Sequence, residues 1–395
     1  MPKLANREDC TGCGACAAAC NHKCVSMKED SIGNIYPEID TSKCVNCKLC
    51  ERFCPILHMP KLNYPEHSYA CWNNKPHERN TSASGGIAFA LYSKAIKNSY
   101  YAVGASQNDD FSVTHKLVDT IDGIRPFKNS KYVFSNAYSI YDEIRDLIHK
   151  GKKIIIIGTP CQIAAFKTLF KNSNQLLLVD IVCHGIVPTI YLQQHICNIE
   201  KQINKKASRM SFRAPEKGTA FYFFTLYDKN DEIIYSKRTA DGELYNLAFH
   251  GCISYRENCY RCKFACSERV GDLTLGDYHG LGLVAPCDYS QDEVSVMFIN
   301  TEKGKSFVTE MLGNDIHADE RPIVEAIQGD AQLRRPSPKG KERYDFEKYI
   351  LSTNCDFDKT IRIVCKKRRR REQKQYMLNL PKRVIKKILK ISGLK

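Results

Sequence analysis

Two groups of cysteines with the same spacing lie near the beginning of the chain. In each run four cysteines are spaced C-x2-C-x2-C-x3-C, and a proline follows the second run. The eight positions are Cys10, Cys13, Cys16, Cys20, Cys44, Cys47, Cys50 and Cys54. Thiolates are soft ligands that select zinc and iron–sulfur clusters. We therefore expect these cysteines to bind metal rather than to form a disulfide framework, which is typical of short secreted chains.

The repeated spacing is that of bacterial two-cluster ferredoxins, in which the fourth cysteine of each run ligates the other [4Fe–4S] cluster. We assign Cys10, Cys13, Cys16 and Cys54 to one cluster, and Cys44, Cys47, Cys50 and Cys20 to the other. A zinc ribbon is disfavoured because both four-cysteine runs are complete. The resemblance predicts a ferredoxin-type domain over residues 1–62. Such a domain conducts electrons, so substrate chemistry must lie further along the chain.

Two further cysteines follow apolar segments that read as strands. Cys161 follows residues 152–157, and Cys183 follows residues 176–182, with a helix expected over residues 163–171. Strand–helix–strand order indicates a parallel α/β sheet. Because open α/β sheets bind ligands at the carboxyl ends of their strands, both cysteines are expected on loops at one ligand-binding edge. Taken singly, each could instead be a core cysteine.

A third group of cysteines lies between residues 252 and 266. It consists of Cys252, Cys259, Cys262 and Cys266, of which Cys259 and Cys262 form a CxxC pair. The pair alone could be a structural zinc knuckle. Together with Cys161 and Cys183 it would supply four thiolates for a third cluster, provided that the loops converge. Cys252 and Cys266 remain alternative ligands.

A glycine-bearing turn precedes an apolar helix expected to begin at residue 87. The turn contains Ser82, Ser84, Gly85 and Gly86. A helix N-terminus with closely approachable backbone binds anions, so the phosphates of a dinucleotide would fit there. A simple helix cap with a tight turn is an equally good interpretation.

The ordered motifs of the body resemble those of the coenzyme F-420 hydrogenase and dehydrogenase beta-subunit group. They are residues 158–162, residues 183–185, residues 211–213, and Cys259-x2-Cys262 followed by residues 271–277. The resemblance implies an α/β flavin-binding body with a β-rich part, FAD, and a [4Fe–4S] cluster beside it. By this likeness Ser82, Ser84, Gly85 and Gly86 hold the FAD pyrophosphate, Thr159 and Pro160 lie near the flavin, and Cys161, Cys183, Cys259 and Cys262 bind the third cluster.

These features together predict an iron–sulfur flavoprotein oxidoreductase. Electrons would pass from a donor such as ferredoxin, through the clusters, to FAD and on to a small-molecule two-electron acceptor, because flavins convert between one- and two-electron chemistry. His184, beside Cys183, is a candidate catalytic proton donor; a hydrogen bond to a cluster sulfur or a structural role in the loop are the alternatives. The alternative is an electron-relay subunit within a larger redox complex, with no substrate of its own.

The charge of the chain is concentrated at its end. Residues 362–395 carry 14 Lys and Arg and one Glu, whereas the whole chain has a net charge of +15. The run at residues 366–371 is not accompanied by a nucleic-acid recognition fold, so no specific nucleic-acid partner is expected. Residues 382–391 are amphipathic at helical spacing, which fits contact with an anionic membrane surface or a partner.

The 395 residues suit several domains. We expect residues 1–62 to form the ferredoxin domain, residues 68–150 the FAD phosphate-binding domain, residues 151–330 the domain with the inner iron–sulfur site, and residues 360–395 a basic tail. The first residues lack the apolar core of a secretory signal. The expected location is the cytoplasm, with peripheral contact at the inner membrane face as a further option.

Overall fold

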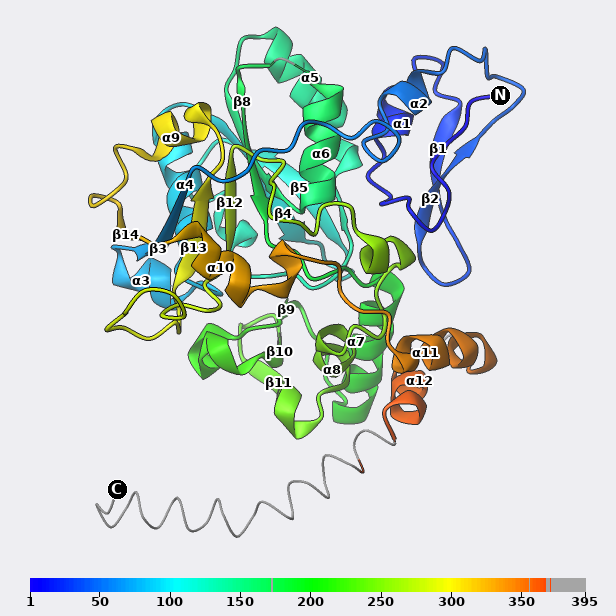
Figure 1. Ribbon diagram of the computed structural model, residues 1–395. Coiled ribbons are helices and arrows are strands. Elements are labelled where there is room, and N and C mark those ends of the chain that lie inside the picture. The colour runs from blue at the N-terminus through cyan, green and yellow to red at the C-terminus, as the bar shows by residue number, and fades with distance from the viewer. Residues whose placement is uncertain (172, 355, 367–369, 371–395) are drawn as a thin grey trace, which may run out of the picture.

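The computed structural model describes residues 1–171, 173–354, 356–366 and 370. The basic run and the amphipathic segment predicted for the tail therefore lie almost wholly outside the described residues. Residues 1–62 form a small unit at one end of the molecule (Figure 1). Its elements are α1 (Ala15–Ala18), β1 (Val25–Glu29), β2 (Ile35–Ile39) and α2 (Leu49–Arg52), with β1 and β2 antiparallel.

A nine-stranded mixed sheet forms the centre of the body, in the order β14-β3-β13-β12-β8-β7-β4-β5-β6. Its strands are β3 (His67–Asn73), β4 (Tyr101–Gln107), β5 (Val113–Val118), β6 (Ser135–Asn136), β7 (Ile154–Gly158), β8 (Leu176–Ile181), β12 (Leu273–Asp277), β13 (Ser295–Ile299) and β14 (Ile316–Glu320). The four neighbours β4, β7, β8 and β12 are parallel, and the strand–helix–strand pattern predicts this for β7 and β8. The segments expected as separate domains over residues 68–150 and 151–330 share this sheet.

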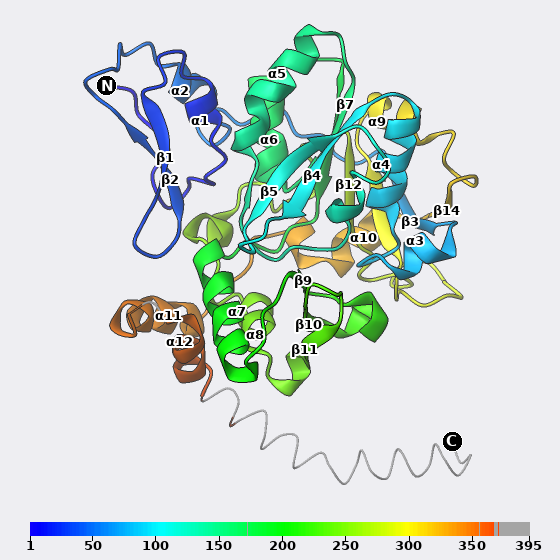
Figure 2. The ribbon, with the colours of Figure 1, turned by 180° about the vertical axis from the view of Figure 1, so that it is seen from behind.

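Helices cover both faces of the sheet, because β7 is apolar on both sides. Ile155 and Ile157 pack towards α4 (Ile87–Lys97) and α9 (Glu302–Val308). Ile154 and Ile156 pack towards α5 (Tyr141–His149) and α6 (Pro160–Leu169). The views from front and back show the resulting three layers (Figures 1 and 2). The unit formed by residues 1–62 lies beside α5 and α6, and its Ala15 and Ile56 share the core around α6.

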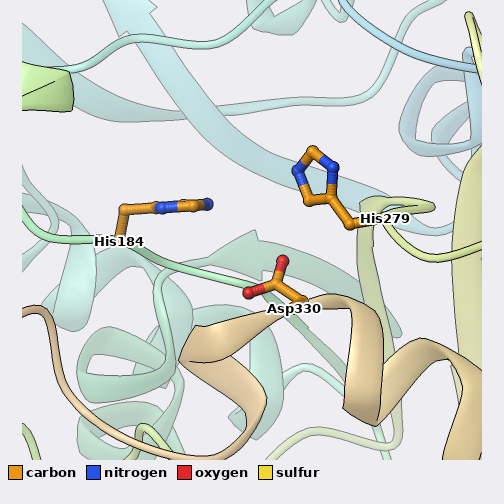
Figure 3. Close-up of side chains that lie close together, drawn as sticks. All are labelled: His184, His279 and Asp330. Carbon is orange, nitrogen blue, oxygen red and sulfur yellow. The ribbon is translucent and has the colours of Figure 1, made fainter.

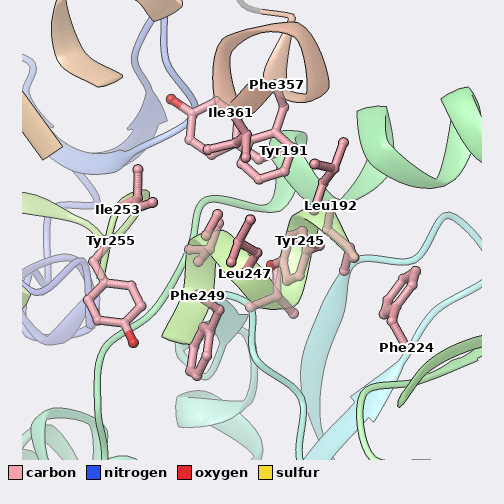
Figure 4. Packing of buried hydrophobic residues seen from close by; sticks show 14 of the residues in the cluster. Tyr191, Leu192, Phe224, Tyr245, Leu247, Phe249, Ile253, Tyr255, Phe357 and Ile361 are labelled. Atoms are coloured by element: carbon pink, nitrogen blue, oxygen red, sulfur yellow. The ribbon is translucent and has the colours of Figure 1, made fainter. Parts of the chain in front are cut away.

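A second core lies below the carboxyl edge of the sheet. It is built from β9 (Arg209–Ser211), β10 (Phe223–Tyr227), β11 (Ile233–Arg238), α7 (Thr189–Ile203), α8 (Leu244–His250), α11 (Lys341–Ser352) and α12 (Phe357–Val364). Its buried side chains are largely aromatic, among them Tyr191, Phe224, Tyr245 and Phe357 (Figure 4). Strands β10 and β11 pair antiparallel with each other.

One predicted boundary is wrong in a way that matters for the site. The helix expected from residue 163 begins at Pro160, so Cys161 lies in the first turn of α6 rather than in a loop. Thr159 caps the helix, with its side chain and that of Gln162 bonding reciprocally to the backbone, and proline is favoured at the first helical position.

Among the described residues no helix combines the length and apolar character that crossing a bilayer requires.

A buried histidine connects the helices of the second core and makes their stability depend on pH. His195 Nδ1 lies 2.6 Å from Asp358 Oδ1, and its Nε2 lies 2.6 Å from Glu243 Oε1. Although burial lowers it, the two carboxylates raise the pKa of His195 to about 9. Because this exceeds the unfolded value of about 6.5, the stabilisation is complete below pH ~6.5 and is lost as pH rises through ~9.

We expect the thermal unfolding midpoint of the wild type to decrease as pH is raised from 6.5 to 9, because the free energy of unfolding falls by about 3 kcal/mol over this range. His195→Gln should have a lower midpoint at pH 6.5 and a flatter profile. The exposed His149 provides the control: His149→Gln should reproduce the wild-type curve. Parallel profiles for wild type and His195→Gln would contradict the account.

Candidate electron-transfer and ligand site

Four cysteines of the N-terminal unit lie together beside the body. Burial raises the pKa of the Cys16 thiol, and the neighbouring Cys13, Cys10 and Cys54 raise it further. Burial also raises the pKa of Cys13 to about 12. Four neighbouring thiols that are difficult to ionise by themselves are suited to binding a cationic iron core. The positive charge of the iron stabilises all four thiolates. These are the four residues assigned to the first cluster.

The second group centres on Cys20, Cys44 and Cys50. Burial raises the pKa of Cys50, with further contributions from Cys20 and Cys44. Cys47 is exposed on the loop between Cys44 and Cys50. Cys24, which lies outside the repeated spacing, is buried with its Sγ 3.3 Å from Cys20 Sγ. Cys16, Cys20 and Cys50 share one core, so the two groups adjoin.

In the body, four cysteines that are distant in sequence line one small cavity. They are Cys161 at the start of α6, Cys183 after β8, and Cys259 and Cys262 on the segment before β12. Burial raises the pKa of Cys183, and the neighbouring Cys259, Cys161 and Cys262 raise it further. The two alternative ligands do not line this cavity: Cys252 and Cys266 lie outside it.

A buried ion pair holds the CxxC segment against the sheet. Arg269 Nη2 donates to Asp180 Oδ1 at 2.5 Å, and both side chains are almost completely buried. Asp180 Oδ2 also accepts from the Gly271 amide, at 2.7 Å. Arg269 Nη1 donates to the carbonyls of Phe264 and Cys266. The pair therefore fixes the turn that carries Cys262 relative to β8, which leads to Cys183.

The N-terminal unit meets the body next to this cavity. A small pocket between them is lined by Gly12 and Cys13 on one side and by Thr159 and Cys161 on the other. Tyr141 Oη donates to the Cys13 carbonyl at 2.8 Å. The first cysteine group thus faces Cys161, and the three groups follow one another through the molecule.

Arg256 lies in the same junction. Its Nη2 donates to the carbonyls of Cys10 and Ile35, and its Nε donates to Asn258 Oδ1. Only 1% of the residue is exposed. No carboxylate pairs with it in the described part of the chain. Burial raises the pKa values of Cys10, Cys161 and Cys259, which belong to two different groups, and the charge of Arg256 opposes this rise at each of them.

A large cavity of about 320 Å³ opens beyond the body cysteines. It shares Thr159, Cys183 and His184 with the small cavity. Ser82, Ser84, Gly86, Thr159 and His184 line it, whereas Gly85 and Pro160 do not. The glycine turn, the strand-end residues and the body cysteines are therefore brought together at one edge of the sheet.

Part of the glycine turn has structural roles, because its side chains and backbone contact neighbouring elements of the protein. Ser82 Oγ donates to the Glu78 carbonyl, and Ser84 Oγ donates to the Val294 carbonyl. A Cβ on Gly85 would lie 2.5 Å from the Cys71 carbonyl oxygen, so this glycine permits close packing on β3. Gly86 has φ +76° and begins α4, whose first amides have no intrahelical acceptors.

Several polar groups of the large cavity have no motif in the sequence. Lys131 is half-buried, and within the described residues its Nζ donates to the carbonyls of Pro126, Lys128 and Asn129. Burial lowers the pKa of Lys131 to about 7. Both ring nitrogens of His115 and the Asn129 side-chain oxygen are buried without a hydrogen-bond partner among the described residues. Sequence analysis missed these residues because they come from a loop and from strand β5, neither of which has a spacing signature.

The dicluster unit, the body cysteines and the mixed sheet define an iron–sulfur electron-transfer protein. Residues 9–56 match the model of the 4Fe-4S dicluster domain. Residues 151–322 match the model that describes the C terminus of the beta subunit in coenzyme F420 hydrogenase/dehydrogenase, and this part of the chain belongs to that family.

Relatives match the chain over much of its length. The F subunit in the F(420)H(2) dehydrogenase of Methanosarcina mazei is 23% identical over 355 residues, covering 85% of this chain and 92% of the relative. The beta subunit in the coenzyme F420 hydrogenase of Methanococcus voltae is 22% identical, covering 58% and 73%. A chain of the F420-reducing [NiFe] hydrogenase complex from Methanosarcina barkeri superposes with a TM-score of 0.45 at 17% identity, covering 76% of this chain and 92% of that chain.

Proposed function

We propose that this protein carries electrons from its two N-terminal clusters, through a third [4Fe–4S] cluster on Cys161, Cys183, Cys259 and Cys262, to FAD in the large cavity, and on to a two-electron acceptor. The observation that carries the proposal is the shared wall. Cys183 and Thr159 border both the small cavity of body cysteines and the large cavity. An electron leaving a cluster there would have to cross only this wall.

The groups lining the large cavity fit a flavin dinucleotide. Its pyrophosphate is dianionic, and the N-terminus of α4 at Gly86 offers unbalanced positive charge, to which Lys131 adds in its protonated form. The His115 and Asn129 atoms that have no hydrogen-bond partner among the described residues could satisfy polar edges of a bound ligand. When bound, FAD would supply the exchange between single electrons and electron pairs. The chain's own residues would bind it and orient it beside Cys183.

Gly86→Val should abolish flavin binding. At φ +76° an L side chain is strained, and a Cβ would lie 3.2 Å from the Glu78 carbonyl oxygen and 3.3 Å from Ser82 Oγ. The valine would also cover the amides of the first turn. We expect at least a ~100-fold weaker flavin affinity, measured by fluorescence titration. Gly151→Val is the control, since nothing lies within 4 Å of a Cβ there although φ is also positive. Equal flavin affinity in both variants would show that the flavin phosphates do not bind at the N-terminus of α4.

The alternative is a relay subunit without a substrate of its own, favoured by the names of the relatives, both of which are subunits. Those names also make coenzyme F420 a candidate acceptor or donor here. Turnover of the isolated chain separates the two functions. With dithionite or reduced ferredoxin as donor, an oxidoreductase should reduce a small acceptor at many turnovers per flavin. A relay subunit should accept electrons once and stop until a partner is added.

A further inference from the structure

Three potential metal ligands meet at the edge of the large cavity. His184 follows β8, His279 follows β12, and Asp330 follows α10 (Ile323–Gly329). Each offers one ligand atom, and all three atoms lie within 4.8 Å of one another. Figure 3 shows the two imidazoles and the carboxylate converging from three separate elements.

The backbone beneath these side chains is tightly held. A Cβ on Gly329 would lie 1.9 Å from the His279 carbonyl oxygen, so the end of α10 packs directly on the His279 backbone. The buried Glu325 carboxylate accepts hydrogen bonds from Arg321 and Tyr278, joining α10 to the segment before His279. The backbone of His184, the third potential ligand, is also held in place, because Ser337 Oγ donates a hydrogen bond to the His184 carbonyl. The arrangement is therefore built by long-range contacts rather than by a chance meeting of mobile side chains.

The negative charge of Asp330 is not balanced by a cationic side chain among the described residues. Asp330 is 4% exposed, and its Oδ1 accepts a hydrogen bond from the Gln332 amide at 2.8 Å. Within the described residues no Lys or Arg forms an ion pair with it, in contrast to Asp277, which pairs with Arg213 at 2.6 Å. A buried carboxylate without a cation is costly. A metal ion between Asp330 and the imidazoles would supply the missing charge.

We propose that His184, His279 and Asp330 bind one divalent transition-metal ion of the Zn²⁺ class. Imidazole and carboxylate suit such ions, and three protein ligands with an open position are typical of sites that bind substrate. Metal–ligand bonds of about 2.0–2.2 Å require ligand atoms about 3–3.5 Å apart. The exposed His184 ring can close the difference by side-chain rotation.

The open position of the ion faces the large cavity, because all three ligands line that cavity. An acceptor that carries a carbonyl, carboxylate or phosphate oxygen could bind there and be polarised by the ion. This specificity for an oxygen-bearing acceptor rests on the proposed function, whereas the metal site itself does not.

Zinc binding to the cluster-loaded protein tests the site. The chain is purified anaerobically with its iron complement intact, so that its thiolates are occupied, then dialysed against a chelator and titrated with Zn²⁺. We expect about one tightly bound Zn²⁺ per chain by elemental analysis. Asp330→Asn and His279→Asn should each weaken binding more than about 100-fold. The asparagine at residue 330 keeps an oxygen for the Gln332 amide, and unchanged iron content verifies folding.

His250→Asn is the matched control, because His250 lines the same cavity outside the triad. It should keep wild-type zinc binding. Absence of zinc from the iron-loaded wild type, retention of zinc in both triad variants, or equal loss in the His250 variant would overturn the proposal. Flavin is measured in the same samples. Flavin without zinc would overturn the metal site alone, and zinc without flavin would overturn the flavin function alone.

Discussion

Cys161→Ala and Cys183→Ala should each remove the third cluster and leave the two N-terminal clusters in place. The anaerobic variants are expected to hold about eight irons per chain instead of about twelve, because each cubane contains four. The N-terminal unit keeps its own eight thiols, which lie on separate loops from the body cysteines. Low-temperature paramagnetic resonance of the reduced proteins should therefore retain the two-cluster signals and lose the third.

The same variants should interrupt electron flow to the flavin. The four body cysteines lie between the N-terminal unit and the large cavity, so their cluster is the intermediate step. Bleaching of bound flavin by a donor that enters through the N-terminal clusters should slow by orders of magnitude in stopped-flow experiments. Cys266→Ala is the matched control, since Cys266 is close in sequence but does not line the cavity. A lost cluster in Cys266→Ala, with wild-type iron in Cys161→Ala, would reassign the ligands.

Arg256→Met should disturb the junction between the N-terminal unit and the body. The substitution removes two hydrogen bonds to the carbonyls of Cys10 and Ile35, which lie in a partly buried interface. Each unsatisfied carbonyl costs about 1–3 kcal/mol. A Cβ on Gly12 would lie 3.1 Å from Arg256 Nη2, so the guanidinium also fills the space beside the first cluster loop.

The substitution should also change cluster potentials. A buried cation without a carboxylate partner is balanced most simply by anionic thiolate clusters on its two sides, and it favours their reduced states. Its removal should lower the midpoint potentials of the first and third clusters by tens of millivolts, as Coulomb interactions at partly buried distances imply. Arg256→Lys separates the two effects: it should keep the potentials near wild type but still weaken the junction. Unchanged potentials in Arg256→Met would show that the residue acts only in packing.

Sequence analysis identified those parts of the site that depend on local spacing. The eight N-terminal cysteines lie in two short loops, so their grouping can be inferred from the intervals between them. Cys161, Cys183 and Cys259 are brought together only by the parallel order of β7, β8 and β12, which the sequence indicates for the first two strands alone. The α6 boundary was misplaced because the Thr159 and Gln162 cap was not recognised.

Other features could not be predicted because they depend on contacts across the fold. The Asp180–Arg269 pair joins residues 89 positions apart, and Arg256 contacts Cys10 across 246 positions. Neither has a motif. Residues 68–150 and 151–330 share one sheet for a similar reason, since strand β3 lies between β13 and β14 from the far end of the body.

The most direct test of the account is the cofactor content of the anaerobically purified chain. Iron, acid-labile sulfide, zinc and flavin are measured on the same sample, with protein determined by amino-acid analysis. The account predicts about twelve irons and twelve sulfides per chain, from three cubanes, together with about one FAD. A reproducible eight irons per chain, and no flavin at full loading of the N-terminal clusters, would contradict it.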